Sequence, residues 1–221
     1  QPWAFQEDIT AEFCMALSLL HRSYGSRLQE TGHKTVGHTC VTDQDKVAAR
    51  LVKGSLLYGE LLPRGVNKAM GPKHLNAAKA STVFDLGMGT GKVAMQVFLQ
   101  FPNVTRVHGV ELSQARFSLG EAALLALMEL QPGVYRIKEH ILGHFISIET
   151  LPREESWVEE GDKEGEGSSG STAAAAKGGW EQGREKELCR GAAGRTLEFA
   201  CGNLFDVADI AQVSHISLLR D

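Results

Sequence analysis

Three glycines at alternate positions, Gly87, Gly89 and Gly91, restrict the fold of this chain more than any other feature of its sequence. A short apolar run, residues 83–86, precedes them, and an apolar stretch at helical spacing, residues 92–101, follows them. This order predicts a buried parallel strand, a tight glycine-rich turn and a helix that packs on the sheet. The sequence therefore indicates an α/β fold.

The next predicted strand, residues 106–110, ends in an acid, Glu111. In a strand–turn–helix unit the ligand lies at the carboxyl end of the strand, where a turn without Cβ atoms lets the backbone come close to it. An acid at the end of the neighbouring strand is then placed to accept both hydroxyls of a ribose. Together these features predict a ligand that contains a nucleoside.

Spacing separates the candidate ligands. A phosphate-binding P-loop needs glycine where Leu86 stands and a hydroxyl where Val93 stands. A dinucleotide fingerprint needs a third glycine where Lys92 stands. The pattern that remains, D-x-G-x-G-x-G beginning at Asp85 with the strand-end Glu111, is typical of S-adenosylmethionine (SAM) methyltransferases. The alternative is an α/β turn that binds no nucleoside.

Length and composition fit a globular chain of one domain, or of one domain with an insertion. The net charge of −4, taken alone, argues against a nucleic-acid binder, but the residues outside the acidic segment 154–187 are close to neutral and identify no partner. The four cysteines form no C-x-x-C pair, so reduced thiols in an intracellular protein are expected. No apolar run is long enough to span a membrane, and the spacing of the histidines predicts no metal site.

The other elements are predicted from apolar spacing and from candidate capping residues, which are Asp8 or Thr10, Thr42 or Asp43, and Ser113. Residues 135–149 predict either a hairpin or a short helix followed by a strand, and residues 196–200 predict a third strand. Residues 153–195 are acidic and rich in Gly, Ser and Ala, which predicts a disordered insertion. Four helices are predicted, in the ranges 10–22, 43–57, 66–80 and 113–130. Residues 25–42 are predicted to form a loop.

Several short motifs are shared with a known family: Tyr58-Gly59-Glu60, residues 84–93, Gln96-Val97, Gly109-Val110-Glu111 and Gly202-Asn203-Leu204-Phe205. With these motifs the chain resembles the disruptor-of-telomeric-silencing family of histone lysine methyltransferases, the non-SET family that modifies a lysine on the globular face of the nucleosome. The residues of these motifs are more similar to the protozoan branch of the family than to the animal branch. The resemblance covers about residues 57–130 and 197–207.

The resemblance implies a set of cofactor-binding residues for SAM. Tyr58 and Glu60 belong to the loop that closes over the amino-acid part of SAM, and Glu111 holds the ribose. Asn203 and Leu204 stand where the family keeps an acid and an aromatic residue against the adenine. The methionine part lies beside the turn formed by Asp85, Gly87, Gly89 and Gly91, and Lys92, which follows the turn, is counted among the cofactor-binding residues. The chain departs from the family at three positions, Leu61 for a hydroxyl residue, Lys92 for a glutamine and Asn203 for an aspartate.

The implied fold is a Rossmann-like SAM-dependent methyltransferase fold with a helical amino-terminal extension. The expected divisions are 1–62 (helical segment and closing loop), 63–152 (first part of the SAM-binding core), 153–195 (insertion) and 196–221 (core, continued and truncated). The implied activity is SAM-dependent N-methylation of a core lysine of histone H3 in the nucleosome, which implies a nuclear location and an indirect contact with DNA.

The catalytic residues stay unassigned, because the family's Asn/aromatic segment lies on and after a fourth strand. Residues 216–219 are expected to begin that strand just before the chain stops at Asp221, so the core is expected to be incomplete at its carboxyl end. Two alternatives to a histone methyltransferase remain from the sequence. One is a methyltransferase with another acceptor, and the other is a truncated SAM-fold module that binds partners without turnover.

Overall fold

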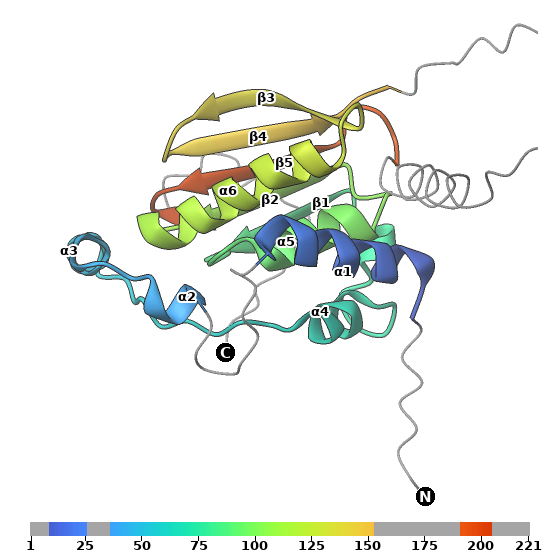
Figure 1. Cartoon of the computed structure of the whole chain (residues 1–221). Coiled ribbons are helices and arrows are strands. Elements are labelled where there is room, and N and C mark those ends of the chain that lie inside the picture. Colours follow the sequence, from blue (N-terminus) through green and yellow to red (C-terminus); the bar gives the residue numbers. More distant parts are fainter. Residues whose placement is uncertain (1–8, 26–35, 153–190, 205–221) are drawn as a thin grey trace, which may run out of the picture.

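The computed structural model describes residues 9–25, 36–152 and 191–204, and within them it forms one mixed five-stranded sheet (Figure 1). The strands lie in the order β1-β2-β5-β4-β3. Their bounds are Thr82–Leu86 (β1), Arg106–Glu111 (β2), Tyr135–Ile141 (β3), Phe145–Thr150 (β4) and Thr196–Cys201 (β5). The three strands predicted around the glycine turn are thus confirmed.

The parallel part of the sheet consists of β1, β2 and β5. In its register Asp85 of β1 pairs with Gly109 of β2, and Glu111 of β2 pairs with Cys201 of β5. Parallel strands run in the same direction, so their carboxyl ends meet at one edge of the sheet. The glycine turn after β1, Glu111 at the end of β2 and Gly202 after β5 therefore share that edge.

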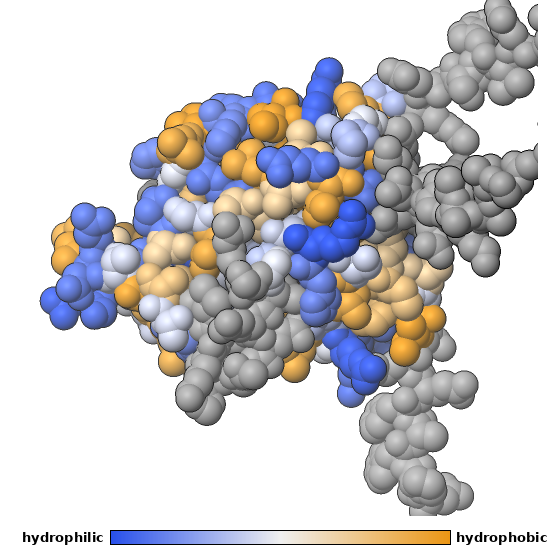
Figure 2. Space-filling view, viewed as in Figure 1, coloured by the Kyte–Doolittle hydropathy of each residue, from blue (hydrophilic) through white to orange (hydrophobic). Residues whose placement is uncertain are grey.

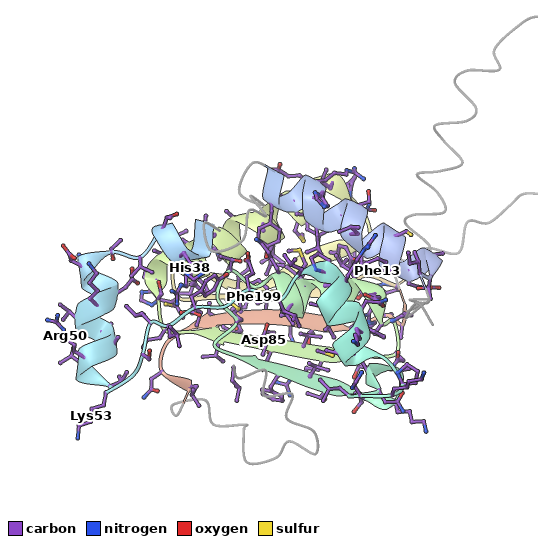
Figure 3. The ribbon with its side chains drawn as sticks, turned by 90° about the horizontal axis from the view of Figure 1, so that it is seen from below. Phe13, His38, Arg50, Lys53, Asp85 and Phe199 are labelled. Carbon is purple, nitrogen blue, oxygen red and sulfur yellow. The ribbon has the colours of Figure 1, made fainter. Side chains whose placement is uncertain are left out.

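Helices α5 and α6 pack on one face of the sheet, and α1 packs on these two helices (Figures 1 and 3). The strand residues that face them, such as Val107, Leu197 and Phe199, are completely buried. Burying one such side chain contributes about 1.5–3 kcal/mol, so this helix–sheet interface holds the glycine turn in place. The helices are α1 (Ala11–Tyr24), α2 (Val36–Thr39), α3 (Asp43–Leu51), α4 (Pro63–Met70), α5 (Lys92–Gln100) and α6 (Gln114–Leu130), with a 3-10 turn η3 at Ala77–Lys79.

Three helices begin at capping residues that the sequence predicts. Thr10 caps α1, and Ser113 caps α6 by accepting a hydrogen bond from the third residue of the helix. Thr42 and Asp45 form a reciprocal capping box at the start of α3, with the Thr42 N–H donating to Asp45 over 2.7 Å. Such caps each stabilise a helix by about 1 kcal/mol.

The predicted helix at 66–80 is wrong in extent. Helix α4 begins earlier, at Pro63, and ends at Met70, and only the 3-10 turn Ala77–Lys79 follows. Gly71 and Pro72 interrupt the helix, because proline lacks an amide donor and disfavours helical backbone in the residue before it.

The predicted helix at 43–57 is also too long, since α3 ends at Leu51. Lys53 adopts a positive φ of 53°, and the Gly54 amide turns back to donate to the carbonyl of Ala49. A left-handed residue of this kind ends a helix. The predicted loop at 25–42 likewise contains, in its described part, the short helix α2.

Residues 135–149 form the hairpin of the two alternatives, with β3 antiparallel to β4. The hairpin is fastened to α6 by Glu121, which accepts a hydrogen bond from the Gly143 amide at 3.0 Å and lies 2.9 Å from His140 Nε2. His140 lies in β3 and His144 in the turn of this hairpin.

Two predictions fall outside the described residues: residues 153–190 of the disordered insertion, and the start of a fourth strand at 216–219. The predicted end of the insertion at residue 195 is wrong, because Arg195 is completely buried and its side chain donates a hydrogen bond to the Val104 carbonyl. None of the described helices combines the length and the apolar character that a membrane crossing requires.

Candidate functional site

The carboxyl edge of the parallel strands brings together most of the residues predicted to bind a ligand. The amides of Gly87 and Met88 donate to the carbonyl of Val110 over 2.8 and 2.9 Å, which fixes the turn against β2. The Gly202 amide donates to the Glu111 carbonyl over 2.9 Å, so the segment with Asn203 and Leu204 begins beside Glu111. Three segments far apart in sequence thus converge on one site.

The glycine turn needs its glycines for two reasons. Gly87, Gly89 and Gly91 all have positive φ, of 82°, 58° and 81°. In addition, a Cβ at Gly89 would lie 2.3 Å from the ring of Tyr58, and a Cβ at Gly91 would lie 2.6 Å from the ring of Phe199. The turn is therefore packed tightly between a sheet residue and the loop that carries Tyr58.

Substitution of Gly89 by alanine is expected to destabilise the fold more than substitution of Gly87. Both variants adopt an unfavourable positive φ, which costs about 1–2 kcal/mol. Only Gly89→Ala also collides with Tyr58, because nothing lies within 4 Å of a Cβ at Gly87. Urea unfolding should show an additional loss of about 1–3 kcal/mol for Gly89→Ala. Equal losses would contradict this packing of Tyr58 on the turn.

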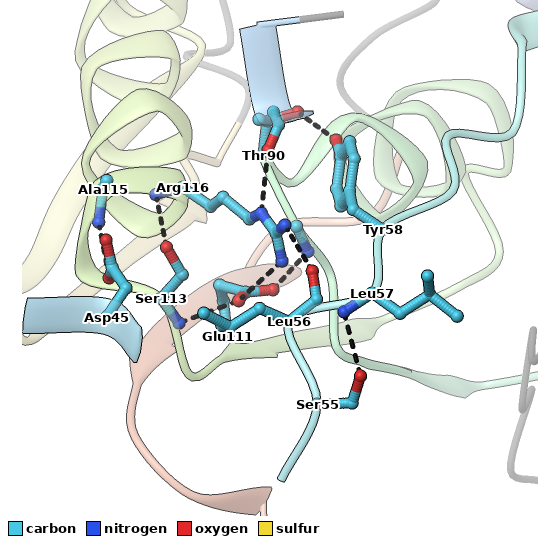
Figure 4. Close-up of polar contacts among 12 residues, drawn as sticks. Asp45, Ser55, Leu56, Leu57, Tyr58, Thr90, Glu111, Ser113, Ala115 and Arg116 are labelled. Carbon is cyan, nitrogen blue, oxygen red and sulfur yellow. Dashed lines mark hydrogen bonds and ion pairs between the residues drawn. The ribbon is translucent and has the colours of Figure 1, made fainter. Parts of the chain in front are cut away.

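Glu111 is 4% exposed and its carboxylate organises the edge. One oxygen accepts a hydrogen bond from the Gly89 amide and the other accepts one from the Ser113 amide, each over 2.8 Å (Figure 4). Burial raises the pKa of Glu111, and the two amides and the Arg116 guanidinium, 3.8 Å away, oppose that increase. A carboxylate has about four acceptor positions, so two remain for ligand hydroxyls.

Asp85 lies at the carboxyl end of β1, beside the sheet core (Figure 3). Its Oδ2 atom is buried and has no hydrogen-bond partner. Burial raises the pKa of this carboxyl to about 7, with the charge of Glu111 adding to the increase and the Ala94 amide opposing it. A buried acid with one unused oxygen and a raised pKa is typical of a functional site.

A second carboxylate whose side chain is buried, Glu60, lies next to the turn. Its Oε1 accepts a hydrogen bond from the Tyr58 hydroxyl at 2.8 Å and forms an ion pair with Lys92 at 2.8 Å. Thr90 contacts the same oxygen at 3.3 Å, and the Tyr24 hydroxyl donates to the Thr90 carbonyl. The other oxygen of Glu60 is buried without a partner. Lys92 is therefore engaged by Glu60.

A segment of the chain covers the Glu111 side of the edge. We call residues 36–60 the flap; it contains α2, α3 and the loop that leads to Tyr58 (Figures 1 and 4). Arg116 of α6 donates a hydrogen bond to the Gly37 carbonyl of the flap. At the start of α6, the Ala115 amide donates a hydrogen bond to Asp45 of the flap. No sequence motif identified Arg116 as a site residue. A basic residue in the first turn of a helix interacts unfavourably with the helix dipole, and this unusual position is the sequence feature that could have indicated a special role for Arg116.

Of the predicted site residues, the structure places Asp85, Gly87, Gly89 and Glu111 around the edge, with Asn203 following Gly202 beside them. Leu204 is partly buried at the end of the same segment. Gly91 begins α5 and packs on the sheet, and Tyr58, Glu60 and Lys92 form the adjoining cluster.

A scan against models of known protein families found no match, and searches of curated proteins and of solved structures found none either. The structure therefore classifies this chain by its fold alone. The chain is an α/β protein with a mixed five-stranded sheet covered by helices, compatible with a Rossmann-like fold.

Proposed function

We propose that this chain binds S-adenosylmethionine at the carboxyl edge of β1, β2 and β5 and that it forms part of a SAM-dependent methyltransferase. The observation that carries the proposal is the juxtaposition of Glu111, which has two acceptor positions left, with the turn at Gly87, where a Cβ would meet no atom within 4 Å. This combination suits a ribose held by its hydroxyls next to an exposed backbone turn.

The charges of the site also suit this cofactor. SAM carries two positive groups, a sulfonium and an ammonium, and it supplies the methyl group when bound. Asp85 and Glu60 each have one buried carboxylate oxygen without a partner, and such oxygens are stabilised by a cationic ligand. A phosphate-bearing nucleotide would meet repulsion from the same acids.

The chain's own residues then have separate tasks. Glu111 accepts the ribose hydroxyls, Asp85 faces the amino-acid part, and Asn203 is the amide offered to the adenine. Tyr58, held by Glu60, covers the turn and excludes water, which favours transfer to an aligned amine.

The acceptor is assigned from the sequence resemblance. On that basis we propose a protein lysine N-methyltransferase that acts on a core lysine of histone H3 in the nucleosome, in the nucleus. A lysine must lose its proton before it can accept a methyl group, and burial in an apolar channel lowers its pKa.

Replacing Glu111 with alanine is expected to weaken binding of SAM and of S-adenosylhomocysteine at least 100-fold. The variant loses two hydrogen bonds to a charged acceptor, each worth about 1.5–3 kcal/mol. Calorimetric titration measures the affinities, and circular dichroism verifies the fold. Glu198→Gln is the matched control, because Glu198 lies on neighbouring β5 and pairs with His108 rather than with the turn. A folded wild-type chain that binds neither compound would contradict the proposal.

The acceptor is tested separately with isotope-labelled SAM. A chain extended to include the family's Asn/aromatic segment should transfer label to reconstituted nucleosomes, to free histone H3 less well, and to neither when Glu111 is replaced. Binding of SAM without transfer to either substrate would contradict the histone assignment and would favour a module that binds without turnover.

A further inference from the structure

The flap, residues 36–60, lies directly over the acid that the ligand needs. The half-buried ring of Tyr58, which the flap carries, fits between two glycines, Gly37 of the flap and Gly89 of the turn. A Cβ at either glycine would lie 2.3 Å from the ring. With the flap in this position Glu111 is 4% exposed, so a ligand cannot reach its carboxylate from solvent.

One side chain, Arg116, connects the flap to the site (Figure 4). Its Nε donates to the carbonyl of Gly37 over 2.9 Å, and an Nη atom donates to the carbonyl of Leu56 over 2.9 Å. The guanidinium also lies 4.3 Å from the centre of the Tyr58 ring and 3.8 Å from Glu111. Arg116 therefore binds both ends of the flap and the acid beneath it.

A second, weaker connection lies at the start of α6. Asp45 of α3 is buried and accepts a hydrogen bond from the Ala115 amide over 3.4 Å. The outer surface of α3 has little contact with the rest of the molecule: Val47 and Leu51 are 53% and 80% exposed, and Arg50 and Lys53 point away from the sheet (Figures 2 and 3). A segment with few buried contacts opens at a small cost in free energy.

We propose that Arg116 is a positioning residue that latches the flap over Glu111, and that a nucleoside ligand enters when this latch opens and is retained when it closes. This inference rests on the proposed cofactor site for its ligand, although the latch itself is defined by contacts within the chain.

The position of Arg116 supports a latch rather than a purely structural role. A buried cation near the positive end of a helix is stable only while its partners compensate its charge. Two of these partners are backbone carbonyls of the flap, so opening the flap exposes the guanidinium to water, which solvates it. The closed state is thus held by contacts that water can replace.

Hydrogen exchange and binding kinetics test the latch in the full chain. The variants are Arg116→Ala and Arg116→Lys, whose ammonium lacks the planar fork that reaches both carbonyls. The matched control is Arg50→Ala, an exposed arginine of the same flap. Without ligand, amides of residues 36–60 should exchange at least tenfold faster in Arg116→Ala, with a smaller increase in Arg116→Lys. Amides of α5 should not change.

With S-adenosylhomocysteine, stopped-flow measurements should show both association and dissociation accelerated in Arg116→Ala, the latter at least tenfold. Unchanged exchange in the flap would overturn the latch. Faster exchange throughout α5 and β2 would overturn it too, because Arg116 would then support the whole core. If the wild type binds no such ligand, the cofactor proposal fails, whereas the exchange comparison without ligand still decides the latch.

Discussion

Replacement of Asp85 by asparagine is expected to stabilise the ligand-free protein at pH 8 while it weakens binding of SAM. The buried Asp85 carboxyl has a pKa of about 7, against an ordinary value of 3.8. Above pH 7 it is therefore a buried charge without a matching cation. Asparagine removes that charge and keeps an oxygen that can accept the hydrogen bond from the Ala94 amide.

The sign follows from proton linkage. Because the folded state binds this proton more tightly than the unfolded state, the contribution of Asp85 to the free energy of unfolding falls as the pH rises from about 4 to about 7. A pKa that increases from 3.8 to about 7 corresponds to a maximum of about 4 kcal/mol. We expect Asp85→Asn to gain about 2–4 kcal/mol at pH 8 and little at pH 4.

Denaturant unfolding at the two pH values measures the gain, and calorimetry measures the loss of affinity. Wild-type affinity for SAM should itself fall below pH 7, because a protonated Asp85 cannot pair with a cation. Asp43→Asn is the control, since Asp43 is exposed on α3, pairs with Lys46, and has a lowered pKa. A variant of Asp85 that is less stable at pH 8, or equally changed at both pH values, would show that the carboxylate is compensated in the folded state.

Replacement of Arg195 by alanine is expected to destabilise the chain by about 3–5 kcal/mol. Arg195 is completely buried just before β5, and its guanidinium donates to the carbonyls of Phe98, Phe101 and Val104. It also lies 4.4 Å from the centre of the Phe98 ring. These carbonyls belong to the end of α5 and the connection to β2, where the helix itself provides no donors. The substitution removes the Arg195 donor from the carbonyls of Phe98 and Val104, whereas the Phe101 carbonyl keeps the hydrogen bond that it accepts from the Val104 amide.

Urea unfolding with an unchanged m-value measures this loss. Arg195→Lys should recover only part of it, because an ammonium lacks the planar stacking and the fixed fork of the guanidinium. Arg136→Ala is the surface control: Arg136 pairs with Glu149 on the exposed hairpin, and such pairs contribute about 0–1 kcal/mol. A loss below about 1 kcal/mol for Arg195→Ala would mean that water reaches these carbonyls in the folded state.

The sequence predicted the central unit of this protein well. The strand, the glycine turn, the helix and the next strand ending at Glu111 were predictable because strand and helix periodicity, positive-φ glycines and the caps at Thr10, Thr42 and Ser113 are local properties. The ends of α3 and α4 were less predictable. They depend on a left-handed Lys53 and on the Gly71–Pro72 break, which compete with an apolar pattern that continues past them.

Local sequence patterns thus specify which elements form and which acids end the strands. What those acids do depends on their packing in the folded chain. The raised pKa of Asp85 comes from burial and from the charge of Glu111 on the neighbouring strand. Arg116 and Arg195 acquire their roles from carbonyls that lie 60 to 97 residues away in sequence. No local pattern encodes such contacts, because they exist only once packing has removed water from the groups involved.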